Sequence, residues 1–274
     1  MVPPSVSVLL PVGRKDKYLQ QALESISQQS FKRFDVHLLV SPGLEEYVTA
    51  QIGAVALKAP YCIHSIRLAN LAFALNIGVE RSDGEFIARM DSDDACEKGR
   101  FDAQVAFLNE HPDCCVVGLR TVLIDENGES LRGQRFPFYG SNEEIRAVLK
   151  RKNPICHPSV MIRRKFLEGV GGYRYGNSAE DHELYLRLAR EEFYTFANLK
   201  DPVFYYRRHG GQLTDRRRAY QAFCDIAGFM LTELFRTKDL RFLVGMFRYH
   251  PLVRRAGACF NRARAWIACF KPLR

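Results

Sequence analysis

Residues 84–94 read GEFIARMDSDD, an apolar run that begins at a turn and ends in three carboxylates. The run from Glu85 to Met90 has the length of a buried strand, and Ser82-Asp83-Gly84 marks the turn before it. Like charges packed so closely repel one another unless a cation lies among them. Ligands of open α/β sheets bind beyond the carboxyl ends of the strands, so this stretch predicts an α/β sheet with a site at its edge.

The residues before this stretch alternate between strand and helix patterns. The apolar run 6–10, closed by Pro11, predicts a strand, and residues 18–26 carry apolar side chains at helical spacing. Residues 35–40 predict a second strand, stopped by Ser41-Pro42-Gly43, and 68–79 a second helix. Strand, helix and strand at this spacing form a βαβ unit, which favours a parallel sheet with a right-handed crossover.

The alternation weakens after the carboxylates. A helix is expected over 101–108, a strand over 114–119, a turn over 125–129, a turn or short strand over 158–162, and a helix from about 181 to 190. We therefore predict an α/β domain over residues 1–215, with a nucleotide-binding half (1–120) and an acceptor-facing half (121–215). Residues 216–274 are expected to form a helical, basic, amphipathic C-terminal region.

The composition is that of an ordinary soluble globular protein, with 47% hydrophobic and 26% charged residues in 274. The net charge of +9 is uneven: residues 236–274 hold ten Lys/Arg against one acid, Asp239, so the first 235 residues sum to zero. The basic character therefore belongs to the C-terminal region and not to the α/β domain.

The cysteines and the hydropathy of the sequence indicate the cellular compartment in which we expect the protein. The eight cysteines form no C-x-x-C pair, which argues against a zinc site or a disulfide scaffold and favours reduced thiols in the cytosol. The first residues lack the pattern of a signal peptide, and there is no run of about 18 apolar residues that would predict a transmembrane helix.

Asp91-Ser92-Asp93 has the residue types of a divalent cation site. Mg²⁺ and Mn²⁺ take oxygen ligands from one or two carboxylates together with phosphate oxygens. The alternative is a solvated acidic turn or a helix N-cap, which short acidic motifs often are.

Two further motifs carry candidate chemistry. Asp181 opens a helix, where a carboxylate is either a cap favoured by the helix dipole or a general base that takes a proton from a hydroxyl. His209 follows Tyr206-Arg207-Arg208 and is either a ligand to metal or phosphate, or a polar side chain without such a role.

Taken in order, these motifs resemble the family 2 glycosyltransferases of bacterial polysaccharide and lipopolysaccharide synthesis. The resemblance covers roughly residues 5–212 and implies a GT-A (Rossmann-like) fold, a mixed, mostly parallel sheet flanked by helices. The matching stretches are 7–12, 18–26 with 29–31, 74–78, 84–94, 153–161, 171–174, 180–181 and 206–209.

The resemblance also implies roles by position. Asp93 is similar to the direct metal ligand, Asp91 to the carboxylate beside the ribose and the metal, and His209 to a histidine near the metal or diphosphate. Asp181 is similar to the base that deprotonates the acceptor, with Glu180 as its neighbour. The residues expected to bind the nucleotide-sugar are Pro11, Val12, Arg14, Asp16, Ser41, Asn76, Arg89, Asp91, Ser92 and His157.

The implied reaction is a single in-line displacement that inverts the anomeric carbon. Mn²⁺ or Mg²⁺ neutralises the leaving diphosphate, and only one base is needed. The partners are a nucleotide-sugar donor and a glycan or lipid-linked acceptor, with the enzyme on the cytoplasmic face of the cell membrane. The family usually has an Asp pair after its second strand, one of which binds uracil, whereas this chain has Ser41-Pro42; Asp16 or Ser41 is the candidate substitute.

Residues 240–274 alternate apolar and basic positions, which is typical of amphipathic helices that lie in a membrane interface. A packed helix pair with a solvated charged face is the alternative, and nucleic-acid binding is not expected because the domain shows no basic-aromatic groove motif. Two other functions stay open. One is a sugar-1-phosphate nucleotidyltransferase, although Gly13-Arg14-Lys15 is a slight phosphate loop; the other is a non-catalytic glycan- or membrane-binding module.

Overall fold

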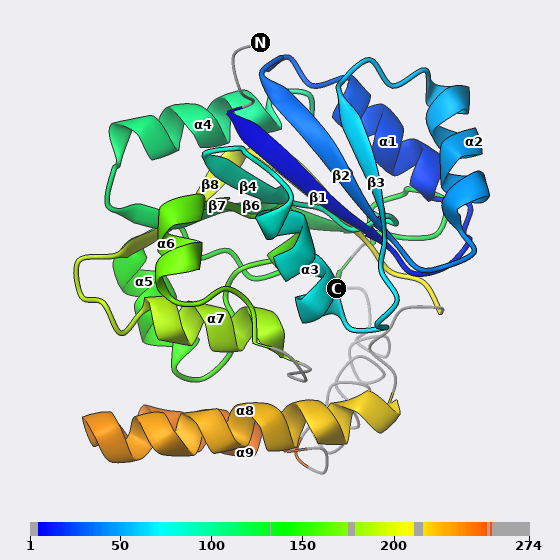
Figure 1. Cartoon of the computed structure of the whole chain (residues 1–274). Coiled ribbons are helices and arrows are strands. Elements are labelled where there is room, and N and C mark those ends of the chain that lie inside the picture. Colours follow the sequence, from blue (N-terminus) through cyan, green and yellow to red (C-terminus); the bar gives the residue numbers. More distant parts are fainter. Residues whose placement is uncertain (1–4, 132, 175–178, 211–215, 251–252, 254–274) are drawn as a thin grey trace, which may run out of the picture.

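The computed structural model describes residues 5–131, 133–174, 179–210, 216–250 and 253. These residues form one eight-stranded sheet in the order β3-β2-β1-β4-β7-β6-β8-β5, with helices on both faces (Figure 1). The strands are β1 (Val6–Val12), β2 (Phe34–Val40), β3 (Tyr61–Ser65), β4 (Phe86–Arg89), β5 (Ala95–Cys96), β6 (Cys114–Ile124), β7 (Met161–Arg163) and β8 (Thr195–Arg207).

Parallel pairing dominates the sheet. β1 pairs in parallel with β2 and β4, β2 with β3, and β6 with β8, whereas β7 and β5 run antiparallel to their neighbours. The prediction of a mixed, mostly parallel sheet flanked by helices is therefore confirmed. The helices are α1 (Leu19–Ser27), α2 (Glu45–Val55), α3 (Leu71–Glu80), α4 (Arg100–Glu110), α5 (Asn142–Leu149), the 3₁₀ helix η1 (His157–Ser159), α6 (Arg164–Gly169), α7 (Glu180–Leu188), α8 (Arg216–Thr237) and α9 (Arg241–Tyr249).

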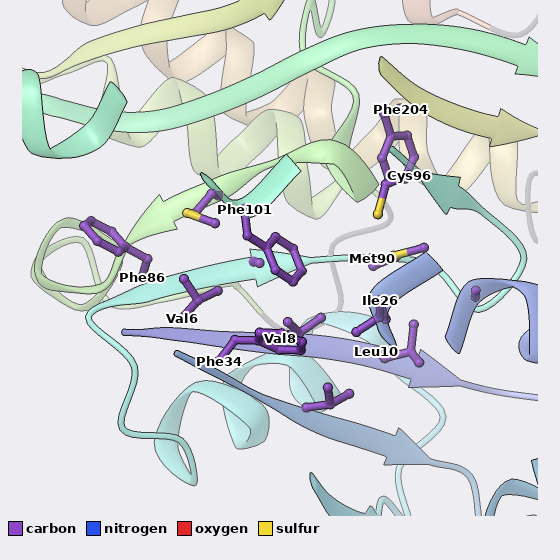
Figure 2. Packing of buried hydrophobic residues seen from close by; sticks show 14 of the residues in the cluster. Val6, Val8, Leu10, Ile26, Phe34, Phe86, Met90, Cys96, Phe101 and Phe204 are labelled. Carbon is purple, nitrogen blue, oxygen red and sulfur yellow. The ribbon is translucent and has the colours of Figure 1, made fainter. Parts of the chain in front are cut away.

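The core lies in two layers, one on each face of the sheet, because side chains alternate along each strand. Val8 and Leu10 of β1 point to the layer that packs under α1, α2 and α4, which Figure 2 shows with Phe34 and Phe101. Leu9 points to the other layer, under α3, α5, α6 and α7. Burial on both faces fixes the position of β1 and β4, the strands that lead into the carboxylates.

Several expected boundaries were wrong. Pro11 lies inside β1 rather than ending it: β4 pairs with β1 only as far as Leu9, so the missing N–H of Pro11 costs no ladder bond to β4. The strand expected over 114–119 continues to Ile124, whereas the turn or short strand expected over 158–162 is confirmed as the 3₁₀ helix η1 followed by β7.

α2, α5, β3 and β8 were not predicted. β8 was missed because Lys200-Asp201-Pro202 in its middle has the composition of a turn, yet the strand passes through it beside a register shift in β6. α8 and α9 confirm that the C-terminal region contains helices, whereas the domain boundary at residue 215 and the division into functional halves stay predictions.

Candidate functional site

Three carboxylates meet where β4 leaves the sheet. The backbone N–H of Met90 donates to the carbonyl of Leu9 at 3.1 Å, which holds the chain against β1 up to Asp91. One carboxylate oxygen from each of Asp91, Asp93 and Asp94 lies within 4.8 Å of the others. The structure therefore brings together the two predicted acids and a third, Asp94, for which no role was predicted.

The pKa values of these carboxyl groups indicate that too little positive charge lies beside them. Burial and the charge of Asp91 raise the pKa of Asp93, and burial together with Asp91 and Asp93 raises that of Asp94 well above its usual value. Among the described residues, Oδ2 of Asp94 is buried and accepts no hydrogen bond. A divalent cation fits such a site, because hard cations take carboxylate oxygens and offset their repulsion.

The end of β8 completes the cluster. The backbone N–H of Arg207 donates to Oδ1 of Asp94 at 2.8 Å, and its Nε donates to the carbonyl of Asp93 at 2.8 Å. Two residues on, Nε2 of His209 lies 2.9 Å from Oδ2 of Asp93. His209 thus reaches the acid predicted to share a metal with it, and a common cation could replace this contact.

Two arginines lie beside different carboxylates of the cluster. Arg89 is buried, and its Nη1 lies 2.6 Å from Oδ1 of Asp91. Arg14 is half-exposed, with its Nη2 3.9 Å from Asp93 and 3.3 Å from His209. The exposed position of Arg14 suits contact with an incoming anion, whereas the side chain of Arg89 is buried and pairs with Asp91.

A second pair of carboxylates opens α7. Its N-cap residue is Ala179, so Asp181 is not the cap. Nδ2 of Asn153 donates to one oxygen of Asp181 at 2.7 Å and the backbone N–H of His182 donates to the other at 2.7 Å, which fixes the carboxylate. Burial raises the pKa of Asp181, whereas the His182 N–H and the charge of Arg89 lower it. A buried, oriented carboxylate of raised pKa has the properties of a general base.

Glu180 lies in a different environment from Asp181. Burial and the neighbouring Asp181 raise its pKa to about 7. Nδ1 of His157 lies 3.8 Å from Oε1 of Glu180, and Nε2 of His157 is 2.9 Å from the hydroxyl of Tyr173. Burial, followed by the charge of Arg89, lowers the pKa of His157 well below its usual value, so the imidazole is neutral. His157 therefore lies close to Glu180 without forming an ion pair, and its hydrogen-bond partner is Tyr173.

We expect Glu180→Gln to change the pH dependence of stability. The folded protein holds the Glu180 proton up to a pKa of about 7, against 4.5 for an unperturbed Glu. Its stabilising contribution is thus full below 4.5 and is lost as the pH rises to 7. Gln cannot ionise, so the variant should exceed wild type in unfolding free energy by on the order of 3 kcal/mol near pH 8, with the difference shrinking towards pH 5.

Thermal unfolding at both pH values measures this difference. Glu191→Gln, at an exposed position after the same helix, is the control and should leave the stability within about 0.5 kcal/mol of wild type. A Glu180→Gln effect that is the same at both pH values would show that the carboxyl does not carry the raised pKa.

The remaining residues of the predicted donor site lie in several positions. Pro11 and Val12 end β1, and the backbone N–H of Ser41 donates to the carbonyl of Val12 at 3.0 Å, so the three lie together at the carboxyl edge. Ser92 lies within the acidic turn. Donor contact by these residues stays a prediction.

Asp16 and Asn76 are already engaged in local structure. Oδ1 of Asp16 accepts the backbone N–H groups of Tyr18 and Leu19, at 2.8 and 3.1 Å, and so supports the start of α1. The amide of Asn76 donates to the carbonyl of Tyr173 at 2.7 Å and accepts its N–H at 2.9 Å. We therefore assign Asn76 to holding the loop that carries Tyr173.

The prediction missed four residues of the site, although each lay in a quoted motif. Asp94 and Arg207 complete the acidic cluster, Asn153 orients Asp181, and Tyr173 holds His157. The partners of these residues are distant in the chain, so the contacts could not be predicted from the sequence. The only signal that could have identified the residues was their position in motifs at the ends of strands and helices.

Comparisons with known proteins bear on the family and the fold of the chain. A family model described as Glycosyl transferase family 2 matches residues 7–171. The chain is 32% identical over 217 residues to the amylovoran biosynthesis glycosyltransferase AmsE of Erwinia amylovora, covering 78% of this chain and 80% of that protein.

Two solved structures share the fold. One is S. aureus TarS in complex with UDP-GlcNAc, with a TM-score of 0.68, 17% identity and coverage of 89% of this chain and 72% of that one. The other is the mannosyltransferase PcManGT from Pyrobaculum calidifontis in complex with GDP-Man and Mn²⁺, with a TM-score of 0.62, 15% identity and coverage of 99% and 77%.

Proposed function

Because the chain belongs to glycosyl transferase family 2 and is a glycosyltransferase of GT-A fold, we propose that it moves a sugar from a nucleotide-diphosphate donor to a hydroxyl of a glycan or lipid-linked acceptor. The proposed reaction inverts the anomeric carbon in one displacement. It is metal-dependent and uses Asp181 as its base.

One observation carries this proposal: the acidic cluster and the α7 carboxylates share one electrostatic environment. Arg89 contacts Asp91 and also lowers the pKa of both Glu180 and Asp181, while the charge of Asp91 raises that of Glu180. A cation site and a base that lie this close suit a reaction in which a diphosphate leaves as a hydroxyl attacks.

Asp93, Asp91 and His209 would hold the metal, with Asp94 adding negative charge beside them. Bound Mn²⁺ or Mg²⁺ would act as a Lewis acid that stabilises charge on the departing diphosphate. The fold relative PcManGT was crystallised with GDP-Man and Mn²⁺, which supports the choice of ion. Arg14, exposed beside Asp93, is proposed to contact the same diphosphate.

Asp181 is the proposed proton acceptor. Asn153 and the His182 N–H each occupy one side of its carboxylate, and the remaining lone pairs can receive a hydroxyl proton. Glu180, which lies close to His157, is proposed as a positioning residue whose carboxyl, with a pKa raised to about 7, lies beside the base. No covalent nucleophile is needed.

The name of AmsE, an amylovoran biosynthesis glycosyltransferase, supports a polysaccharide or its precursor as acceptor. Such acceptors favour a cytoplasmic protein at the inner face of the cell membrane. Contact of residues 240–274 with that membrane stays a prediction, and residues 251–252 and 254–274 lie outside the described part of the chain.

The donor is open because this chain lacks the usual Asp pair after β2, and its two fold relatives were crystallised with UDP-GlcNAc and GDP-Man. A panel of nucleotide-sugars should therefore contain one that raises the melting temperature only when Mn²⁺ is present. At about 100-fold the Kd, a ligand stabilises by about 2.7 kcal/mol, which a thermal shift resolves.

The released product distinguishes a glycosyltransferase from the alternative enzyme, a sugar-1-phosphate nucleotidyltransferase. Incubating the stabilising donor with an acceptor should release nucleoside diphosphate. Release of pyrophosphate from nucleoside triphosphate and a sugar phosphate would instead identify a sugar-1-phosphate nucleotidyltransferase, and stabilisation without any turnover would favour the binding module.

A further inference from the structure

α8 and α9 form a two-helix layer along one side of the molecule, below α5 and α7 in Figure 1. α8 buries Ile226 and Met230, and its Glu233 pairs with Arg190, which follows α7, at 2.6 Å. α9 buries Phe242 and Gly245; a Cβ on Gly245 would lie 2.7 Å from the carbonyl of Lys150, at the end of α5. Both helices therefore turn their buried faces towards the α/β domain.

The opposite faces of both helices carry large apolar side chains exposed to solvent. They are spaced by three, four or eleven residues, which are close to whole numbers of helical turns, and so each helix carries them in one stripe. Because both buried faces point to the domain, the two stripes lie together on its outer side. This outer face consists of Tyr220 (62% exposed), Leu231 (40%), Phe235 (67%), Leu240 (70%), Val244 (54%) and Phe247 (63%).

The charges around the outer face are predominantly basic. Glu233 is buried between Arg190 and Arg236, and Asp239 pairs with Lys150 and Arg241. The side chains of Arg236 and Arg241 are nevertheless half-exposed. Lys238 and Arg248 are exposed as well. The outer face is thus an apolar strip with a basic margin.

We propose that this outer face docks on an anionic lipid bilayer. Amphipathic helices with apolar and basic side chains lie in the interface plane, with the apolar side in the acyl region and the cations at the headgroups. A second copy of the chain is a poorer fit, because a two-fold interface would bring two basic margins together. Among the described residues no helix has the length and hydropathy to cross a membrane, so the contact proposed is peripheral.

This inference extends the sequence prediction, which placed membrane contact only at residues 240–274. The structure adds Tyr220, Leu231 and Phe235 of α8 to the same surface. It is also independent of the proposed reaction, since none of these residues lies in the acidic cluster or beside Asp181.

The test uses the full chain and sedimentation with vesicles of equimolar phosphatidylglycerol and phosphatidylcholine, against vesicles of phosphatidylcholine alone. We expect binding to the anionic vesicles that weakens with added salt. The double variant Phe235→Glu with Phe247→Glu should lower the partition coefficient by about 100-fold or more, because each Phe forfeits a tenfold gain from apolar burial.

Tyr61→Glu is the matched control, since Tyr61 is also an exposed aromatic (43%) and β3 lies on the other side of the molecule from α8 (Figure 1). It should bind vesicles as wild type does. Circular dichroism and the Mn²⁺-dependent thermal shift with donor should be unchanged in all variants, which establishes that they fold.

Equal partitioning of the double variant and wild type would overturn the proposal. So would a dimer of the wild type in solution that the double variant converts to a monomer, because the outer face would then be an interface between copies. The two proposals can fail separately. If the double variant lost vesicle binding while Asp93→Ala kept full turnover, the membrane proposal would stand and the proposed reaction would fail.

Discussion

Asp93→Ala is expected to reduce sugar transfer by at least about 10³-fold. Asp93 is the acid closest to His209, and both are proposed to hold the metal, whose Lewis acidity supplies several kcal/mol of transition-state stabilisation. The variant should also lose the rise in melting temperature that Mn²⁺ gives in the presence of donor. This second measurement does not depend on turnover and reports the metal site directly.

Asp83→Asn is the matched control, because it removes an exposed carboxylate from the turn that precedes the same strand. It should transfer sugar at a rate within about twofold of wild type. If Asp93→Ala kept its Mn²⁺-dependent stabilisation, the acidic cluster would not be the cation site, and the proposed function would have to be abandoned.

Asp181→Asn should lower kcat by about 10²–10⁴-fold, the range for loss of a general base. Asn has the same size and can still accept from Asn153 or from the His182 N–H, so the start of α7 should keep its structure. Donor affinity, measured by titration with Mn²⁺ present, should stay within about threefold of wild type, because the base contacts the acceptor and not the nucleotide.

Two further variants test whether the effect belongs to the carboxylate. Glu191→Gln, exposed after α7, should leave kcat unchanged. Asn153→Ala removes one hydrogen bond that orients Asp181 and should cost about 10- to 100-fold in kcat, the size of one lost hydrogen bond to a charged group. Turnover by Asp181→Asn within about threefold of wild type would exclude Asp181 as the base.

β1, β2 and β4 were predictable because they are buried on both faces of the sheet. Such strands appear as mostly apolar runs, as in β1, β2 and β4, and helices with periodic apolar residues separate them. β8 escaped prediction because a turn-like Lys200-Asp201-Pro202 lies in its middle. Its position depends on pairing with β6 and β5, which local sequence does not encode.

The site was predictable as a set of positions but not as a set of contacts. The carboxylates follow β4 directly, so their gathering could be foreseen from chain order alone. Arg207 meets Asp94 across 113 positions, and Asn153 meets Asp181 across 28, so only the folded chain reveals them. The same holds for Asn76, whose amide bonds to the backbone of Tyr173 across 97 positions, while its predicted contact with the donor stays a prediction.

The contacts of Arg207 have a consequence for how the enzyme is made. Its guanidinium stacks over Tyr18, at 4.6 Å from the ring centroid, donates to the carbonyl of Asp125 and the side chain of Gln21, and its backbone secures Asp94. A nascent chain that has emerged only as far as β7 already contains every acid of the cluster, but not the strand that locks them in place. The proposed cation site should therefore be completed late in translation, once residues 207–209 have left the ribosome and packed against the first helix.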